Sequence, residues 1–313
     1  MRRCMTRWLL SVGIYSQSLL FAPQLLGHVR LGHRELPEPR DNEQVTQEPR
    51  PPRPTLQQVR DITQPPEIVT RANSEHWLGI PYFRKVSPFL TRWFILWSIS
   101  PNAVTYLMIV VGASASFALL VPGVFGAMLG ALLAQLQMIV DCCDGEVARW
   151  QQKYSPLGFF LDKVAHYVAE GLVPLAIGIR AAGGLAIFQS TTMTWWPLLG
   201  AVVSLLVVWN KALNDAVHVA RAHNGLAKLV ESPSVNAPTI SGLQRIRSLT
   251  KFFPFQRIFH SVEMTFLAFL ASIADAVLGG LAATQFALSA VFVLICITLV
   301  GHFVSIVTSS RLR

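Results

Sequence analysis

The residues with the clearest potential for chemistry lie between positions 141 and 166. Asp141 and Asp144 are three positions apart, and Asp162 and His166 are four apart. If both segments are helical, each pair lies on one helix face about one turn apart. Long apolar runs flank the stretch on both sides. Because unpaired acids beside lipid are costly, this cluster is a candidate functional site.

The surrounding residues favour binding of a phosphate group. Three neighbouring carboxylates cannot all be ionised unless cations lie between them. Oxygen ligands of this kind suit Mg²⁺ or Mn²⁺, and two such ions about 3.5–4 Å apart can clamp a diphosphate. Arg149 adds a permanent cation that can bind phosphate through two parallel hydrogen bonds. Gly145, Ala148 and Gly158 keep side-chain bulk low, as close approach to a ligand requires.

The spacing resembles the signature of the CDP-alcohol phosphatidyltransferases, D-x2-D-G-x2-A-R-x8-G-x3-D-x3-D. Seven of its eight fixed positions match: Asp141, Asp144, Gly145, Ala148, Arg149, Gly158 and Asp162. In that family a hydroxyl attacks the β-phosphorus of a CDP-alcohol, CMP leaves and a phosphodiester forms. The resemblance implies that the three aspartates bind Mg²⁺ or Mn²⁺ in a two-metal site. It also implies that Gly145, Ala148, Arg149 and Gly158 bind the CDP part of the donor.

His166 occupies the position of the last family aspartate, which is thought to bind metal and to accept the proton of the attacking hydroxyl. Histidine is competent in both roles, because it titrates near neutral pH and imidazole ligates Mn²⁺ or Zn²⁺. We expect an active enzyme with His166 as general base and metal ligand. Glu170, one turn further along, is a possible orienter of the imidazole. The alternatives are that His166 disables the enzyme and that Glu170 pairs elsewhere in the bundle.

Composition indicates an integral membrane protein. Hydrophobic residues make up 52% of the 313 residues and charged residues only 14%, against about 25% charged in soluble proteins. The net charge of +9 falls mainly in the N-terminal region and one loop, which suits an anionic membrane surface rather than nucleic acid. The cysteines show no C-x-x-C pair, so no zinc site or disulfide framework is indicated.

Six apolar runs have the length of a membrane-spanning helix. They lie near 103–121, 124–143, 157–181, 195–213, 261–282 and 284–306. Pro122-Gly123 predicts a tight turn between the first two. With six spans, the arm, the segment 144–157, the basic loop 214–257 and the C-terminus share one side. That side holds nearly all the Lys and Arg, so we expect the acidic cluster to face the cytoplasm, at the inner membrane if the source is bacterial.

The N-terminal third has a different composition. Residues 1–75 are expected to form a mostly disordered arm, because 28–75 are rich in Pro, Arg, Glu and Gln. Residues 1–27 resemble a signal peptide in part, and a membrane-surface helix or an over-extended start codon are the alternatives. Residues 76–99 are predicted to form an interfacial helix, with Ser87-Pro88 as its start and aromatic residues on one face.

Three further positions are candidate substrate contacts. Asn102 and Thr105 belong to a P-N-x-x-T stretch similar to one that lies near the nucleotide site in the family. Lys211, at the cytoplasmic end of the fourth run, is either a phosphate ligand or a lysine that extends to the membrane surface.

The prediction is therefore an all-α, six-span membrane protein with an interfacial helix, a disordered arm and a membrane domain at 100–310. By resemblance it is a homodimer in phospholipid biosynthesis, with a CDP-lipid donor of the CDP-diacylglycerol type and a polar hydroxyl acceptor that the sequence does not specify. A non-catalytic relative that binds CDP-lipid is one alternative, and a membrane transporter or scaffold is another.

Overall fold

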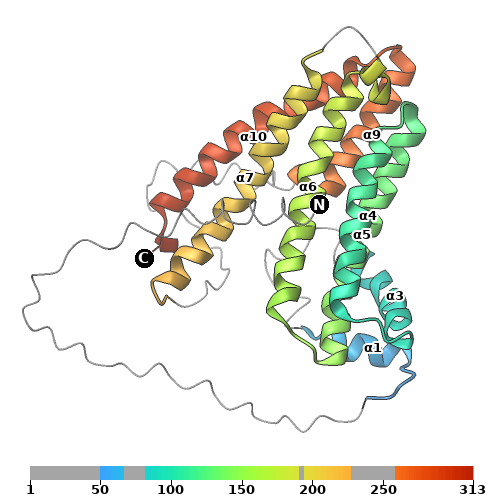
Figure 1. Cartoon of the computed structure of the whole chain (residues 1–313), viewed down its shortest axis with the longest axis vertical. Helices are drawn as coiled ribbons and strands as arrows, with labels where there is room; N and C mark the ends of the chain where they lie inside the picture. Colours follow the sequence, from blue (N-terminus) through green and yellow to red (C-terminus); the bar gives the residue numbers. More distant parts are fainter. Residues whose placement is uncertain (1–49, 67–81, 190–193, 227–257, 313) are drawn as a thin grey trace, which may run out of the picture. The chain divides into compact units, whose positions relative to one another are not determined.

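The structure, a computed structural model, describes residues 50–66, 82–189, 194–226 and 258–312. Within these residues the regular elements are all helical, as predicted (Figure 1). Two short helices come first, α1 (Leu56–Thr63) and α3 (Arg84–Leu96). Six long helices follow: α4 (Pro101–Leu119), α5 (Gly123–Gln151), α6 (Pro156–Ala181), α7 (Trp196–His223), α9 (Ser261–Leu278) and α10 (Ala282–Thr308). Two 3₁₀ turns, η2 (Gly184–Gln189) and η4 (Ser310–Leu312), follow α6 and α10.

Five of the six long helices are long and apolar enough to cross a membrane: α4, α5, α7, α9 and α10. These helices indicate an integral membrane protein. The sixth, α6, is also long, but Asp162, Lys163, Glu170 and Arg180 lie along it. The predicted count of six spans therefore stays a prediction. The sixth helix, α6, is more polar than the other five because it carries charged residues, some of which belong to the predicted site.

Local sequence signals set the starts of the helices that carry the site. Ser100 and Ser155 precede α4 and α6, and each serine hydroxyl accepts a hydrogen bond from a backbone N–H in the first turn. A proline follows each serine at the first helical position, where its missing N–H costs nothing. Gly123 has a φ of +79° and opens α5, which confirms the predicted tight turn after α4.

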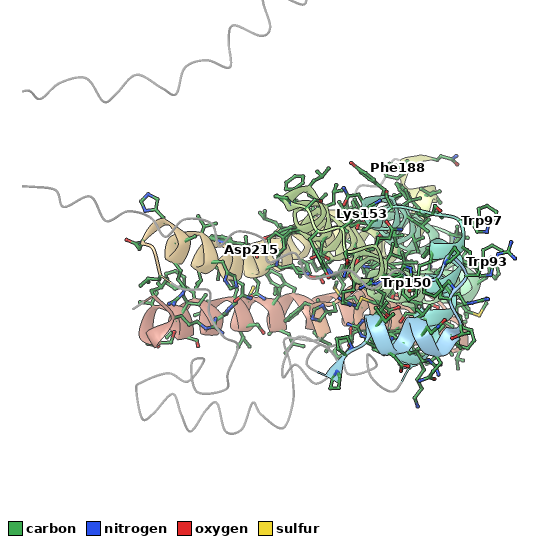
Figure 2. The ribbon with its side chains drawn as sticks, turned by 90° about the horizontal axis from the view of Figure 1, so that it is seen from below. Trp93, Trp97, Trp150, Lys153, Phe188 and Asp215 are labelled. Carbon is green, nitrogen blue, oxygen red and sulfur yellow. The ribbon has the colours of Figure 1, made fainter. Side chains whose placement is uncertain are left out.

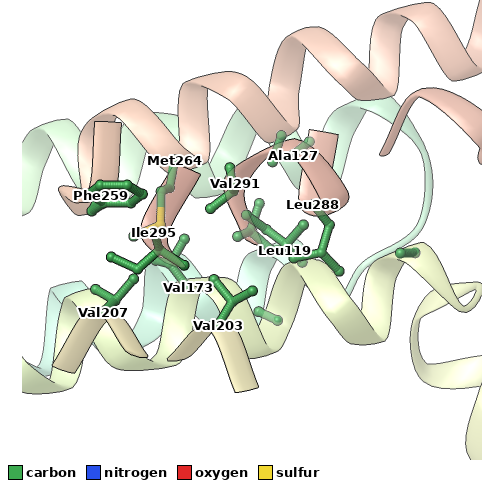
Figure 3. Close-up of a cluster of buried hydrophobic side chains, with 14 residues drawn as sticks. Leu119, Ala127, Val173, Val203, Val207, Phe259, Met264, Leu288, Val291 and Ile295 are labelled. Carbon is green, nitrogen blue, oxygen red and sulfur yellow. The ribbon is translucent and has the colours of Figure 1, made fainter. Parts of the chain in front are cut away.

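Most of the apolar core lies where α6, α7, α9 and α10 meet. Val173, Val203, Met264, Leu288 and Ile295 are almost completely buried there (Figure 3). Helices α6 and α7 approach closely because glycines face each other. A Cβ atom added to Gly178 would lie 2.7 Å from the Gly200 Cα atom. This packing fixes the position of α6, which contributes half of the predicted acidic cluster.

Residues 50–66 differ from the expected disordered arm. Thr55 and Gln58 form a capping box at the start of α1, and Val59 and Thr63 on this helix are fully buried. The composition of this segment is polar overall, but burial of one face of α1 against α3 and α5 stabilises the helix. The rest of the arm, including residues 1–27, lies outside the described residues.

The predicted start of the interfacial helix at Ser87-Pro88 was wrong, because α3 begins at Arg84. Ser87 is buried, and its hydroxyl donates to Glu146 on α5 instead of capping a helix. Trp93 and Trp97 stack on the outer side of α3 and are mostly exposed (Figure 2). Exposed aromatics suit a membrane interface, so the interfacial position of α3 stays a prediction.

Candidate functional site

Three of the predicted ligands meet between α5 and α6. The Nε2 atom of His166 lies 3.4 Å from Oδ1 of Asp141 and 3.6 Å from Oδ1 of Asp162. One ligand atom from each of the three residues lies within 4.8 Å of the others. All three side chains are half-buried, with 21–36% of each exposed. The four-residue spacing on α6 therefore places Asp162 and His166 on one face, opposite the acids of α5.

Asp144 lies one helical turn beyond Asp141 and points towards α4. Its Oδ2 atom accepts a hydrogen bond of 2.9 Å from the Thr105 hydroxyl. Thr105 is buried near the start of α4, in the stretch predicted to lie near the nucleotide site. Asp144 does not belong to the ligand group of Asp141, Asp162 and His166. That group provides ligands for one ion. A second ion stays a prediction.

The sequence predicts that the small residues of the motif leave room for a ligand, and in the structure Gly145 and Gly158 each lie next to a side chain of the protein itself. A Cβ atom added to Gly158 would lie 3.0 Å from the Asn102 side-chain oxygen, so Asn102 and Gly158 are neighbours at the starts of α4 and α6. A Cβ atom added to Gly145 would lie 3.0 Å from Nη1 of Arg149. Ala148, one position before this arginine, is half-buried. The guanidinium therefore lies over the glycine of the motif on the same helix.

Arg149 also contacts the N-terminal segment. Its Nε atom donates a 2.6 Å hydrogen bond to the backbone carbonyl of Thr63, the last residue of α1. The Arg50 guanidinium donates to the carbonyls of Arg149 and Trp150 and lies over the Trp150 ring. The segment 50–66 thus holds the end of α5 that carries the motif arginine. Sequence reasoning missed this contact because the arm carries no motif.

Glu146 is the second feature that sequence reasoning missed. Its side chain is completely buried, and its two carboxylate oxygens accept 2.6 Å hydrogen bonds from Ser87 and Thr91. Gln64 donates a third bond of 2.9 Å, and the Arg84 guanidinium lies 3.4 Å away. Glu146 therefore ties α1 and α3 to the motif segment of α5. The available signal was an acidic residue inside the motif, between Gly145 and Ala148.

On the other side of His166 lies a cluster formed by Glu170, Lys211 and His260. The buried Glu170 Oε1 atom lies 2.5 Å from Nζ of Lys211 and 3.0 Å from Nδ1 of His260. It lies 3.8 Å from Nδ1 of His166, which is beyond hydrogen-bond distance. The structure therefore pairs Glu170 chiefly with Lys211 and His260, on α7 and immediately before α9, rather than with the imidazole it was expected to orient.

The donor set fits a divalent cation. Two carboxylate oxygens and one imidazole nitrogen face one another at separations typical of ligands around a single small ion. The imidazole favours Mn²⁺ or Zn²⁺ over Mg²⁺, because Mg²⁺ prefers oxygen ligands.

Comparison with known families agrees with this geometry. Residues 98–244 match the family model described as CDP-alcohol phosphatidyltransferase, which includes α4 to α7 and both halves of the acidic cluster. Over these residues the comparison confirms the family predicted from the motif. No match was found among curated proteins. Members of this family transfer a substituted phosphate from a CDP-alcohol to an acceptor alcohol and generally depend on a divalent metal.

Proposed function

We propose that the protein transfers a phosphatidyl-type group from a CDP-alcohol, of the CDP-diacylglycerol kind, to the hydroxyl of a polar acceptor and releases CMP. This reaction belongs to phospholipid biosynthesis. The observation that carries the proposal is the meeting of Asp141, Asp162 and His166 within 4.8 Å inside the region that matches the family. Residues of α5 and α6 converge there because both helices pack against α4 and α9.

The donor would bind through the motif residues. Asp141, Asp144 and Asp162 would hold Mg²⁺ or Mn²⁺, which would neutralise the diphosphate and stabilise the leaving CMP oxygen. Arg149 would pair with a donor phosphate, with its guanidinium already fixed by the Thr63 carbonyl. Gly145, Ala148 and Gly158 would leave room for the cytidine part. Asn102 and Thr105, at the start of α4, would line the same side of the donor site.

His166 would act as the general base. Its Nε2 atom faces the acids, so a hydroxyl attacking the phosphorus held there could give its proton to this nitrogen. The new bond joins the acceptor oxygen to the β-phosphorus, and the bond from that phosphorus to the CMP oxygen breaks. One nitrogen cannot bind a metal and accept a proton at the same time. We therefore assign the proton to His166 and the metal to the three aspartates during the attack.

Two alternative functions belong to other classes of protein. A non-catalytic relative would bind CDP-lipid without turnover, and its support is the histidine at the last motif position. A transporter or scaffold would use the acids as an ion site, but such sites usually lie near the bilayer midplane. In this proposal the site faces the cytoplasm, α3 lies on the membrane surface and the protein is a homodimer like its relatives.

Release of CMP tests the proposal. Full-length protein in nanodiscs is given CDP-diacylglycerol, a panel of polar alcohols and Mg²⁺ or Mn²⁺. We expect metal-dependent CMP release that requires an acceptor. Asp162→Ala should reduce turnover by more than about 100-fold, because it removes a ligand rather than a supporting residue. Asp61→Ala, at an exposed position on α1, is the matched control and should keep full activity.

Metal and nucleotide binding separate the alternatives. Asp162→Ala should lose Mn²⁺ binding and CDP binding together, whereas His166→Ala should keep Mn²⁺ and lose turnover. Full activity of Asp162→Ala would refute the metal site. Binding of CDP-lipid without CMP release from any acceptor would favour the non-catalytic relative.

A further inference from the structure

We infer that the acceptor in the proposed reaction is an alcohol without a phosphate group, and that Glu170 sets this preference. The inference rests on the proposed function, because it concerns the molecule that must approach His166. It is carried by the cluster of Glu170, Lys211 and His260, which stands beside the base.

The position of the cluster makes it the natural neighbour of the acceptor. The attacking hydroxyl must lie at Nε2 of His166, between Asp141 and Asp162. The opposite ring nitrogen lies 3.8 Å from Glu170. Lys211 and His260 have 24% and 41% of their side chains exposed, so a small polar molecule can contact them. The part of the acceptor that does not react would therefore lie against these three side chains.

Charge decides what the cluster can accept. Lys211 is the cation of this cluster that could hold a phosphate, but its ammonium lies 2.5 Å from the Glu170 carboxylate. Glu170 is buried, so its negative charge is weakly screened by water and cannot move away from an incoming anion. A phosphate monoester placed at Lys211 would meet this carboxylate at close range. Like charges brought together at a binding site oppose binding strongly.

Lys163, the lysine of α6, is also paired with a carboxylate. Lys163 Nζ lies 3.1 Å from Oδ1 of Asp215 on α7, and the hydroxyl of Tyr167 donates to the other oxygen of that carboxylate. Lys163 and Lys211 are the lysines of α6 and α7, and each has a carboxylate partner. The lysines of the two facing helices therefore do not form a cationic pocket for phosphate, and the arginines of these helices, Arg180 and Arg221, lie in their last turns.

The same side chains suit hydroxyl groups. Lys211 donates hydrogen bonds, the carboxylate of Glu170 accepts them, and the imidazole of His260 can do either. A hydroxyl group both donates and accepts, so a neutral polyol can satisfy this mixed set without adding charge. The geometry therefore favours an uncharged polyol over its phosphorylated counterpart.

Matched acceptor pairs test the inference. CMP release is measured with glycerol against glycerol phosphate and with inositol against inositol phosphate, so that the members of each pair differ by one phosphate. We expect kcat/KM for the neutral member to be higher by at least about tenfold, because the phosphate meets Glu170. Preference for the phosphorylated member would overturn the inference and leave the proposed function standing. No CMP release from any acceptor would instead count against the proposed function.

A variant pair isolates the role of Glu170. Glu170→Gln removes the negative charge and should raise kcat/KM for the phosphorylated member relative to the neutral one by about tenfold. Asp61→Asn is the control, since it also removes a carboxylate but at an exposed position on α1, which the charge argument does not use. It should leave the acceptor ratio unchanged. An unchanged ratio in folded Glu170→Gln would overturn the assignment.

Phosphate binding gives a readout that needs no turnover. Inorganic phosphate is titrated into the wild-type protein in nanodiscs and followed by phosphorus NMR. We expect no saturable binding in the millimolar range, and binding that appears in Glu170→Gln. Saturable binding to the wild-type protein that is lost in Lys211→Gln would overturn the charge argument, whether or not Glu170→Gln folds.

Discussion

Truncation of Glu146 to alanine should detach α1 and α3 from α5. This carboxylate is fully buried and accepts hydrogen bonds from Ser87, Thr91 and Gln64. Removing one member of a buried charged network costs about 3–5 kcal/mol, because its partners are left buried without an acceptor. The individual bonds would sum to more, but they share one carboxylate and are not additive.

The expected loss can be measured as local opening. At about 1.4 kcal/mol for each factor of ten, a loss of about 3 kcal/mol raises the opening equilibrium roughly 100-fold. Hydrogen–deuterium exchange of the protein in nanodiscs, followed by mass spectrometry, should show this increase in peptides from α1 and α3. Peptides from α7 and α10 should exchange at the wild-type rate, because these helices do not contact Glu146.

Two variants control the Glu146 experiment. Glu146→Gln keeps the size of the side chain and one acceptor oxygen, so its exchange rates should fall between those of the wild type and Glu146→Ala. Asp61→Ala changes an exposed acid on α1 and should have no effect. Unchanged exchange of α3 in Glu146→Ala would refute the view that this carboxylate anchors the N-terminal segment.

Two further predictions concern the base and the helix packing. His166→Asp should retain CMP release and move the acidic limb of the pH–rate profile to lower pH, because aspartate ordinarily titrates near ~3.9 and histidine near ~6.5. Full turnover by His166→Ala would exclude the base role. Gly178→Ala should destabilise the fold by about 1–3 kcal/mol, because the new Cβ would meet backbone atoms of α7 at 2.7 Å. Gly301→Ala, which meets nothing within 4 Å, should leave the thermal midpoint in detergent unchanged, and equal midpoints for both variants would contradict the close packing of α6 and α7.

The long helices could be predicted because their signals are local. Apolar runs of spanning length, serine–proline starts and the Pro122-Gly123 turn each act within a few residues, and the structure places helices over all six predicted runs. The start of α3 could not be found in this way. Ser87-Pro88 is a normal signal for a helix start. In the structure the Ser87 hydroxyl instead donates a hydrogen bond to Glu146, which is distant in the sequence.

For the candidate site, the sequence by itself determined which residues share a helix face and which family the motif resembles. Asp162 and His166 needed only the four-residue spacing, and the family assignment needed only the motif. The partners across helices were decided by tertiary structure. Lys211 was open to two interpretations until α6 and α7 brought it to Glu170, and the contact of Arg149 with Thr63 joins residues 86 positions apart. The physical reason is that spacing fixes direction around one helix axis, whereas the neighbour that a side chain meets depends on how separate helices pack.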